Sequence, residues 1–251
     1  MSLRWVLPLI LCLFAGCVSS GGGDPTTTER GRNDARDAYI QLGSGYLHEG
    51  MTARAKVPLR KALELDPKSA DAHAALALVF QTEMEVELAD QEYRQALSYS
   101  DDARILNNYG SFLYEQGRYK EAFERFQQAS KDPLYPERAR VFENMGLTEL
   151  KLGRTGDAEN YFVRSLRLDN RRSSALLELA TLSYNAKQYV PAKRYYDNFT
   201  ELSEQNARSL LLGVHLADIF QERDKSANLV LRLKRLYPAS PEYKTYLSEQ
   251  R

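Results

Sequence analysis

One set of small and large residues returns along this chain at an interval close to 34 residues. The first copy, read in order, is Tyr39, Leu42, Gly43, Tyr46, Ala55, Leu59, Ala62 and Pro67. Shifts of 34, 33, 36, 34 and 34 residues carry the pattern onward to Leu210, where the last copy is much degraded. A unit of this length cannot bury its apolar face alone, so the copies must stack to form a continuous core. The period therefore predicts a solenoid of repeated units.

The spacing within each copy resembles that of the tetratricopeptide repeat, whose unit is a pair of helices. Gly43, Gly110 and Gly146 stand where the two helices of a pair cross closely, and Ala55 is the matching small residue on a second helix. Pro67 ends its helix because proline cannot continue the hydrogen-bond ladder. We therefore predict an all-α fold, a right-handed superhelical solenoid of six tetratricopeptide repeats.

The repeats are expected over residues 36–69, 70–102, 103–138, 139–172, 173–206 and 207–240, followed by a short closing helix. The degraded sixth copy fits the expectation that a terminal repeat is atypical and caps the array. Leu42, Tyr46 and Leu59 are predicted to fill the space beside the first crossing. Glu149 and Ser183 stand where large residues are preferred, which predicts local deviations in the fourth and fifth repeats.

The start of the chain has a different character. Arg4 is followed by an uncharged run from Trp5 to Val18, which at 14 residues is shorter than the roughly 20 needed to cross a bilayer. A positive start, a short apolar run and small residues at its end are typical of a cleavable secretory signal. The segment LFAGC, which ends at Cys17, resembles the bacterial lipobox.

This resemblance implies that diacylglycerol is attached to the thiol of Cys17, that the chain is cut before this residue, and that a third acyl chain is added. Each buried CH₂ contributes about 0.8 kcal/mol, so three acyl chains would make a firm anchor. Val18, rather than Asp, follows the cysteine, which resembles the outer-membrane sorting pattern. We expect a signal peptide over residues 1–16, a lipidated flexible linker over 17–35 and the solenoid over 36–251.

The charge balance and the sequence motifs limit the kinds of chemistry expected of this chain. The chain has 34 basic and 34 acidic residues, so no large field of one sign is available to hold nucleic acid. His48, His73 and His215 lie in three different repeats, and the sequence contains neither a zinc-protease motif nor a glycine-rich phosphate loop. We expect no catalytic residue, no metal site, no cofactor and no small-molecule substrate.

The inner face of a stacked array is the expected binding surface. In tetratricopeptide proteins it is formed by positions 2, 5, 9, 12 and 13 of each repeat. The residues assigned to a partner-binding groove are Ile40, Ser44, Leu47, Leu78, Asn107, Tyr114, Arg140, Leu147 and Leu150. The apolar members could accept a segment of another polypeptide, at roughly 1.5–3 kcal/mol for each large side chain buried. They could instead face a neighbouring helix or the linker, and Asn107 and Arg140 could belong to a solvated polar face.

Three segments carry a more specific resemblance: RNDARDAYIQLGSGYLHEGMTARAKVPLRKALELDP, NNYGSFLYEQGRYKEAFERFQQA and NMGLTELKLGRTGDAENYF. Together with the lipobox and the linker, they resemble the PilF/PilW family of type IV pilus pilotins. The resemblance implies a lipoprotein that faces the periplasm and is anchored in the outer membrane. Its partner would be the pilus secretin subunit, which it would bring to the outer membrane and help to multimerise.

Two other classes of function remain open. A periplasmic scaffold for cell-wall or outer-membrane assembly enzymes would share the anchor and the repeats. A hydrolase would require an acid/base site assembled by folding from residues that are distant in the sequence.

Overall fold

Helices make up almost all of the structure, a computed structural model that describes residues 25–250. Within this range a short 3₁₀ helix, η1 (Pro25–Thr27), precedes thirteen α-helices, and there is no strand. The helices are α1 (Glu29–His48), α2 (Thr52–Leu65), α3 (Ala70–Thr82), α4 (Val86–Tyr99), α5 (Ala103–Glu115), α6 (Tyr119–Ala129), α7 (Arg138–Lys151), α8 (Thr155–Leu168), α9 (Ser173–Asn185), α10 (Tyr189–Leu202), α11 (Ala207–Ile219), α12 (Arg223–Leu236) and α13 (Pro241–Glu249). Each odd-numbered helix from α1 to α11 packs against the next, which gives six pairs. The predicted all-α tetratricopeptide fold is confirmed.

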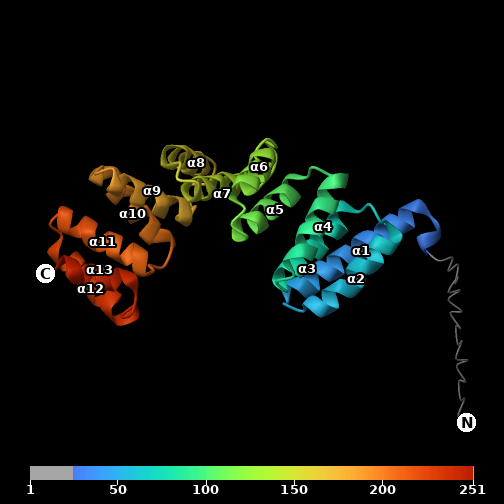
Figure 1. Ribbon diagram of the computed structural model, residues 1–251, viewed down its shortest axis with the longest axis horizontal. Coiled ribbons are helices and arrows are strands. Elements are labelled where there is room, and N and C mark those ends of the chain that lie inside the picture. The colour runs from blue at the N-terminus through green and yellow to red at the C-terminus, as the bar shows by residue number, and fades with distance from the viewer. Residues whose placement is uncertain (1–24, 251) are drawn as a thin grey trace, which may run out of the picture.

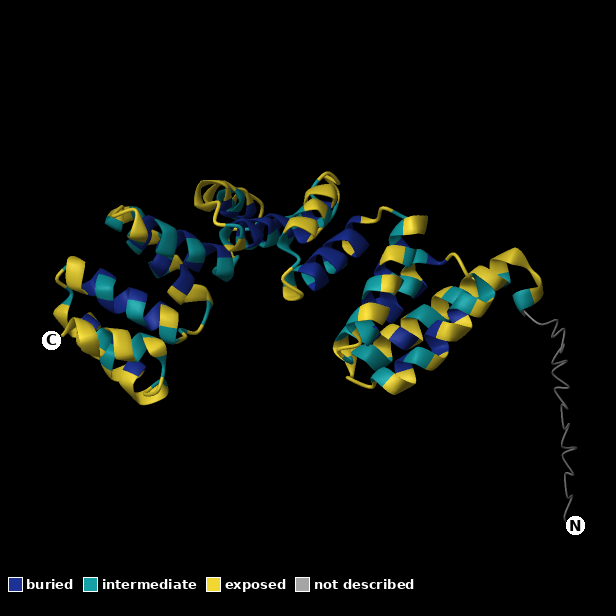
Figure 2. Ribbon diagram, in the orientation of Figure 1, coloured by how far each residue is buried: buried dark blue, intermediate teal, exposed yellow. Residues whose placement is uncertain are grey.

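The pairs follow one another in chain order along a curved array, with α1 and α12 at opposite ends (Figure 1). Buried residues are most numerous in first helices of the pairs, such as α5 and α7, whereas α13 has none (Figure 2). No helix in the described range is both long and apolar enough to pass through a bilayer.

Close helix crossings hold the pairs together. A Cβ added at Gly110 would lie 2.6 Å from Cε1 of Phe126, and one at Gly146 would lie 2.6 Å from Cε1 of Phe162. In the first pair the same contact is made by Gly43, where a Cβ would lie 2.5 Å from Cγ of Leu59. Each glycine therefore allows a large apolar side chain of the second helix to press against the backbone of the first.

The turn between the two helices of a pair needs one residue in the left-handed region. Gly50, Gly117 and Gly153 supply it in three pairs, with φ angles of 74°, 72° and 78°. The equivalent residues of the other three pairs are Met84, Lys187 and Gln221, with φ angles of 61°, 58° and 58°. The turn geometry is thus kept even where a side chain makes it less favourable.

The predicted linker over residues 17–35 is too long, because α1 begins at Glu29. Thr28 caps the helix, since its Oγ1 accepts a hydrogen bond from the backbone N–H of Gly31 at 3.0 Å. About two turns further on, a guanidinium nitrogen of Arg36 lies 3.1 Å from Oδ2 of Asp66, which ties α1 to the end of α2. The predicted signal peptide and Cys17 lie outside the described residues.

Leu42 does not fill the space beside the first crossing as predicted, since it is 48% exposed. Its counterpart in the second repeat, Leu76, is 4% exposed. The difference follows from position in the array: Leu76 packs against Ala55 and Leu59 of the preceding repeat, and in the described range no repeat precedes the first.

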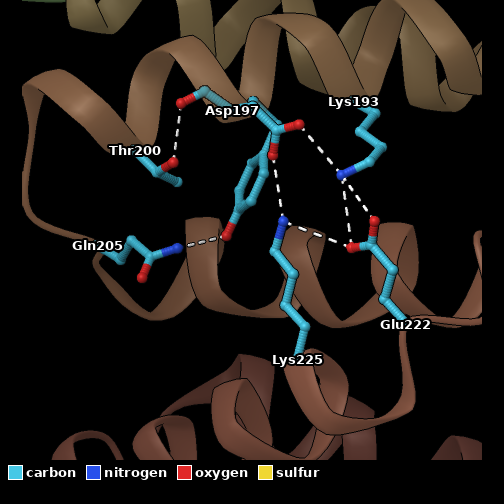
Figure 3. A network of polar contacts seen from close by, with 7 residues as sticks. Lys193, Asp197, Thr200, Gln205, Glu222 and Lys225 are labelled. Atoms are coloured by element: carbon cyan, nitrogen blue, oxygen red, sulfur yellow. Dashed lines mark hydrogen bonds and ion pairs between the residues drawn. The ribbon is translucent and has the colours of Figure 1, made fainter.

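Charged side chains join the second helices of the fifth and sixth repeats. Lys193 lies 3.1 Å from Asp197 and 3.0 Å from Glu222, and Lys225 lies 3.2 Å from Asp197 and 3.5 Å from Glu222. Figure 3 shows these four residues as a closed circuit of alternating charge between α10 and the start of α12. Partly exposed pairs of this kind contribute little stability each, so the circuit mainly fixes how the two repeats align.

The glycine contacts predict the effect of adding one methyl group. Gly146→Ala should lower the free energy of unfolding by about 1–3 kcal/mol, because the new Cβ overlaps the ring of Phe162. Gly45→Ala, on an open face of α1 where nothing lies within 4 Å, should instead raise it by up to about 1 kcal/mol. Urea unfolding followed by circular dichroism measures both. Equal stability of the two variants would contradict the role assigned to the crossing.

Candidate functional site

The first helices of the pairs form the candidate binding surface, and a first hollow opens on it near the N-terminal end. Its volume is about 390 Å³. Three of the predicted groove residues, Ile40, Ser44 and Leu78, line it. The other lining residues are Asp37 and Gln41 of α1, Asp71 and Ala75 of α3, and Arg104 of α5. Arg104 forms an ion pair with Asp71 across the hollow, so charge here is largely balanced.

A second hollow of about 250 Å³ lies between α5 and α7. The predicted groove residues Tyr114 and Leu147 line it, together with Ser111, Glu115, Phe126 and Asn144. The ring of Tyr114 is held edge-on against that of Tyr119, with centroids 5.3 Å apart. Burial, followed by the nearby Tyr119 and the carboxylate of Glu178, raises the pKa of Tyr114, so its phenol stays protonated at neutral pH.

Asn107 differs from the prediction, because it is 2% exposed and not open to a ligand. Its Oδ1 accepts a hydrogen bond from Nδ2 of Asn144 at 3.1 Å, so it supports the second hollow from beneath. Arg140 lines neither hollow, and its Nε lies 3.5 Å from Oε2 of Glu137. Leu47 and Leu150 each pack against a core cluster shared between their own repeat and the next, and also line neither hollow. The predicted groove residues that line a hollow are thus divided between two hollows that share no lining residue.

Residues at matching or adjacent positions of neighbouring repeats meet across this surface. Asp71 pairs with Arg104, 33 residues later. The Gln81 side chain donates from Nε2 to Oε2 of Glu115, 34 residues later, at 2.8 Å. Asp37 stands 34 residues before Asp71, so the repeat spacing itself was the signal that could have added these hollow-lining residues to the prediction.

The three histidines each have different surroundings. His48 is exposed at the end of α1, and His215 lies 2.8 Å from Oε2 of Glu249 and stacks on Tyr184. They are not brought together, so no acid/base site of the kind that the hydrolase hypothesis requires forms from them. No group of three or more His, Cys, Asp or Glu side chains in the described range is placed to hold a metal ion.

His73 links the first two repeats. Its Nδ1 lies 2.6 Å from Oε2 of Glu92, and its Nε2 lies 3.1 Å from the carbonyl oxygen of Pro67. Both partners are acceptors, and only the doubly protonated ring can donate to both. Burial acts to lower the pKa of His73, but the hydrogen bonds to Glu92 and Pro67 outweigh it and raise that pKa above its ordinary value.

Tetratricopeptide-repeat family models match the chain over residues 37–69 and 101–171. The type IV pilus assembly protein PilF of Pseudomonas aeruginosa is 58% identical over 252 residues, which cover 100% of both chains. An uncharacterized protein of Haemophilus influenzae is 27% identical over 162 residues, which cover 64% of this chain and 88% of that protein.

Two solved structures also resemble this chain over most of its length. A structure of Pseudomonas aeruginosa PilF matches with a TM-score of 0.86 and 60% identity, covering 87% of this chain and 99% of that chain. The crystal structure of PilW, a type IV pilus biogenesis factor, matches with a TM-score of 0.72 and 31% identity, covering 84% and 98%.

The contacts of His73 predict a pH-dependent stability. Because its pKa is raised in the folded state, the added stability is fully present below the ordinary histidine pKa of about 6.5 and is lost as pH rises through the folded-state pKa. His73→Gln should therefore lower the free energy of unfolding most at acid pH. Urea unfolding between about pH 5 and about pH 9 tests this, with His48→Gln as the exposed control. A deficit that stays constant with pH would contradict the doubly protonated state.

Proposed function

The chain belongs to the PilF/PilW family of type IV pilus biogenesis proteins, and on that premise we propose that it is a pilotin. In this role it is a lipoprotein of the outer membrane that binds the pilus secretin subunit. It promotes the localisation of that subunit to the outer membrane and its multimerisation there.

The observation that carries this proposal is the binding surface itself. Two hollows lie on the face built from the first helices of the pairs, and apolar side chains line both: Ile40 and Leu78 in one, Tyr114 and Leu147 in the other. Surfaces of this size and shape suit segments of another polypeptide, because each hollow accepts one or two side chains while the surrounding polar groups contact its backbone.

The mechanism combines this surface with the anchor expected at Cys17. The hollows hold an unassembled secretin subunit, and the acyl chains commit the complex to the outer membrane. Recruitment to a membrane surface raises the local concentration of subunits, which favours their multimerisation without any new contact between them.

Loss of the anchor should separate binding from delivery. Cys17→Ser should leave the helical array folded and still able to bind the secretin subunit, but should reduce the secretin in outer-membrane fractions and the amount of its multimer. Membrane fractionation and immunoblotting of the multimer measure this. Unchanged secretin localisation would contradict the tethering mechanism. Altered cell-wall turnover with normal secretin multimers in a deletion strain would favour the scaffold function instead.

Substitutions in the hollows should weaken binding while the fold is kept. Ile40→Glu and Leu147→Glu each replace an apolar lining residue of a hollow by a charged one, and we expect binding of the secretin subunit to weaken by about ten- to a hundredfold. Ser44 is exposed and lines the first hollow, so Ser44→Tyr should fill that hollow without disturbing the core. We expect it to weaken binding to a similar degree. Leu134→Glu, at a leucine that is 86% exposed and lines neither hollow, is the matched control. Pull-down with purified secretin subunit, alongside thermal melting, tests these variants. Full binding by folded Ser44→Tyr and Leu147→Glu proteins would show that the partner binds elsewhere.

A further inference from the structure

The second hollow is lined in part by Phe126, whose position depends on the absence of a side chain at Gly110. The ring of Phe126 belongs to α6, yet it reaches the face of α5 because Gly110 has no Cβ to block it. Tyr114 and Leu147 are the other apolar residues that line it. With a volume of about 250 Å³, the hollow can accept one large apolar side chain.

Polar groups at the same hollow are placed for a peptide backbone. Ser111 already donates its hydroxyl to the carbonyl oxygen of Asn107 at 3.0 Å. Asn144 donates a hydrogen bond from Nδ2 to Oδ1 of Asn107 at 3.1 Å. Among the described residues, no donor reaches the side-chain oxygen of Asn144. That oxygen remains available to accept a backbone N–H from a bound segment.

The charge at this hollow is unusual for the surface. Most carboxylates along the first helices are paired with a cation: Asp37 with Arg36, Asp71 with Arg104, Glu143 with Arg172 and Glu178 with Arg208. Glu115 is the only acidic residue lining the second hollow, and in the described part of the chain its side chain bonds only to the neutral amide of Gln81. It is also the last residue of α5, where the helix dipole adds to the negative potential.

We propose that the second hollow is a subsite for a partner segment in which a large apolar residue stands beside a lysine or arginine. The apolar side chain occupies the space between Tyr114, Phe126 and Leu147, and the cation pairs with Glu115 at the rim. This rests on the proposed function, because it specifies the chemistry of the polypeptide that the surface binds.

Two blocked dipeptides test the subsite without the natural partner: N-acetyl-Phe-Arg-amide and N-acetyl-Phe-Glu-amide. Each is titrated into the detergent-solubilised full chain carrying ¹³C-methyl-labelled leucine, so that Leu147 reports on the second hollow. Both should shift the Leu147 methyl signals saturably. The arginine dipeptide should bind about two- to fivefold more tightly, the ratio expected for an ion pair at a solvent-exposed rim.

Glu115→Gln should abolish this preference without unfolding the chain, because the side chain is exposed. Glu121→Gln removes the same charge from the same repeat, at an exposed residue that lies outside the hollow and pairs with Arg118, and should leave the preference intact.

Equal affinity for the two dipeptides, or a preference that survives Glu115→Gln, would overturn the proposal. So would the absence of a saturable shift at Leu147. A shift there that grows with protein concentration alone would identify a second copy of the chain as the occupant, which also overturns it. If the dipeptides bind as expected but deletion of the protein leaves secretin localisation unchanged, the pilotin role is contradicted and the subsite is supported.

Discussion

Every level of this structure depends on a close contact between a residue with little or no side chain on the first helix of a pair and a large apolar residue on the second. At Gly110 and Gly146 the ring of a phenylalanine presses against the opposite backbone, and one added methyl group would overlap it. Because neither helix can shift without losing this contact, each pair behaves as a fixed block. The array is built by stacking such blocks.

Stacked blocks bring matching positions of neighbouring repeats into contact, and this produces the binding surface. Asp71 meets Arg104 at the matching position of the next repeat, and Gln81 meets Glu115, one residue beyond its matching position. Because each repeat contributes different side chains to these contacts, the two hollows on the surface differ. In the first hollow Arg104 forms an ion pair with Asp71, whereas in the second the carboxylate of Glu115 bonds, among the described residues, only to the amide of Gln81, so the two hollows differ in charge.

Departures from the repeat pattern are compensated locally rather than transmitted along the array. Glu149 stands where the third repeat has Leu113, and it is 3% exposed, yet Arg154 forms an ion pair with it and α7 still packs against α8. Glu143 is likewise buried, and both Arg172 and the backbone N–H of Ala175 bind its carboxylate. A buried charge with such partners avoids most of the cost that an isolated one would carry.

The 34-residue period by itself determined the fold class and the pairing of helices, because glycines, alanines and prolines at fixed spacing leave few other ways to bury the apolar positions. It also predicted which helix face a partner would bind. Only the tertiary structure decided that α1 begins at Glu29, that Leu42 lies uncovered at the end of the array, and that Asn107 is buried. These outcomes depend on what stands next to each residue in space, and a repeat pattern describes an average repeat with neighbours on both sides. For the same reason, only the structure could show that Glu115, at the second hollow, has no cation paired with it among the described residues.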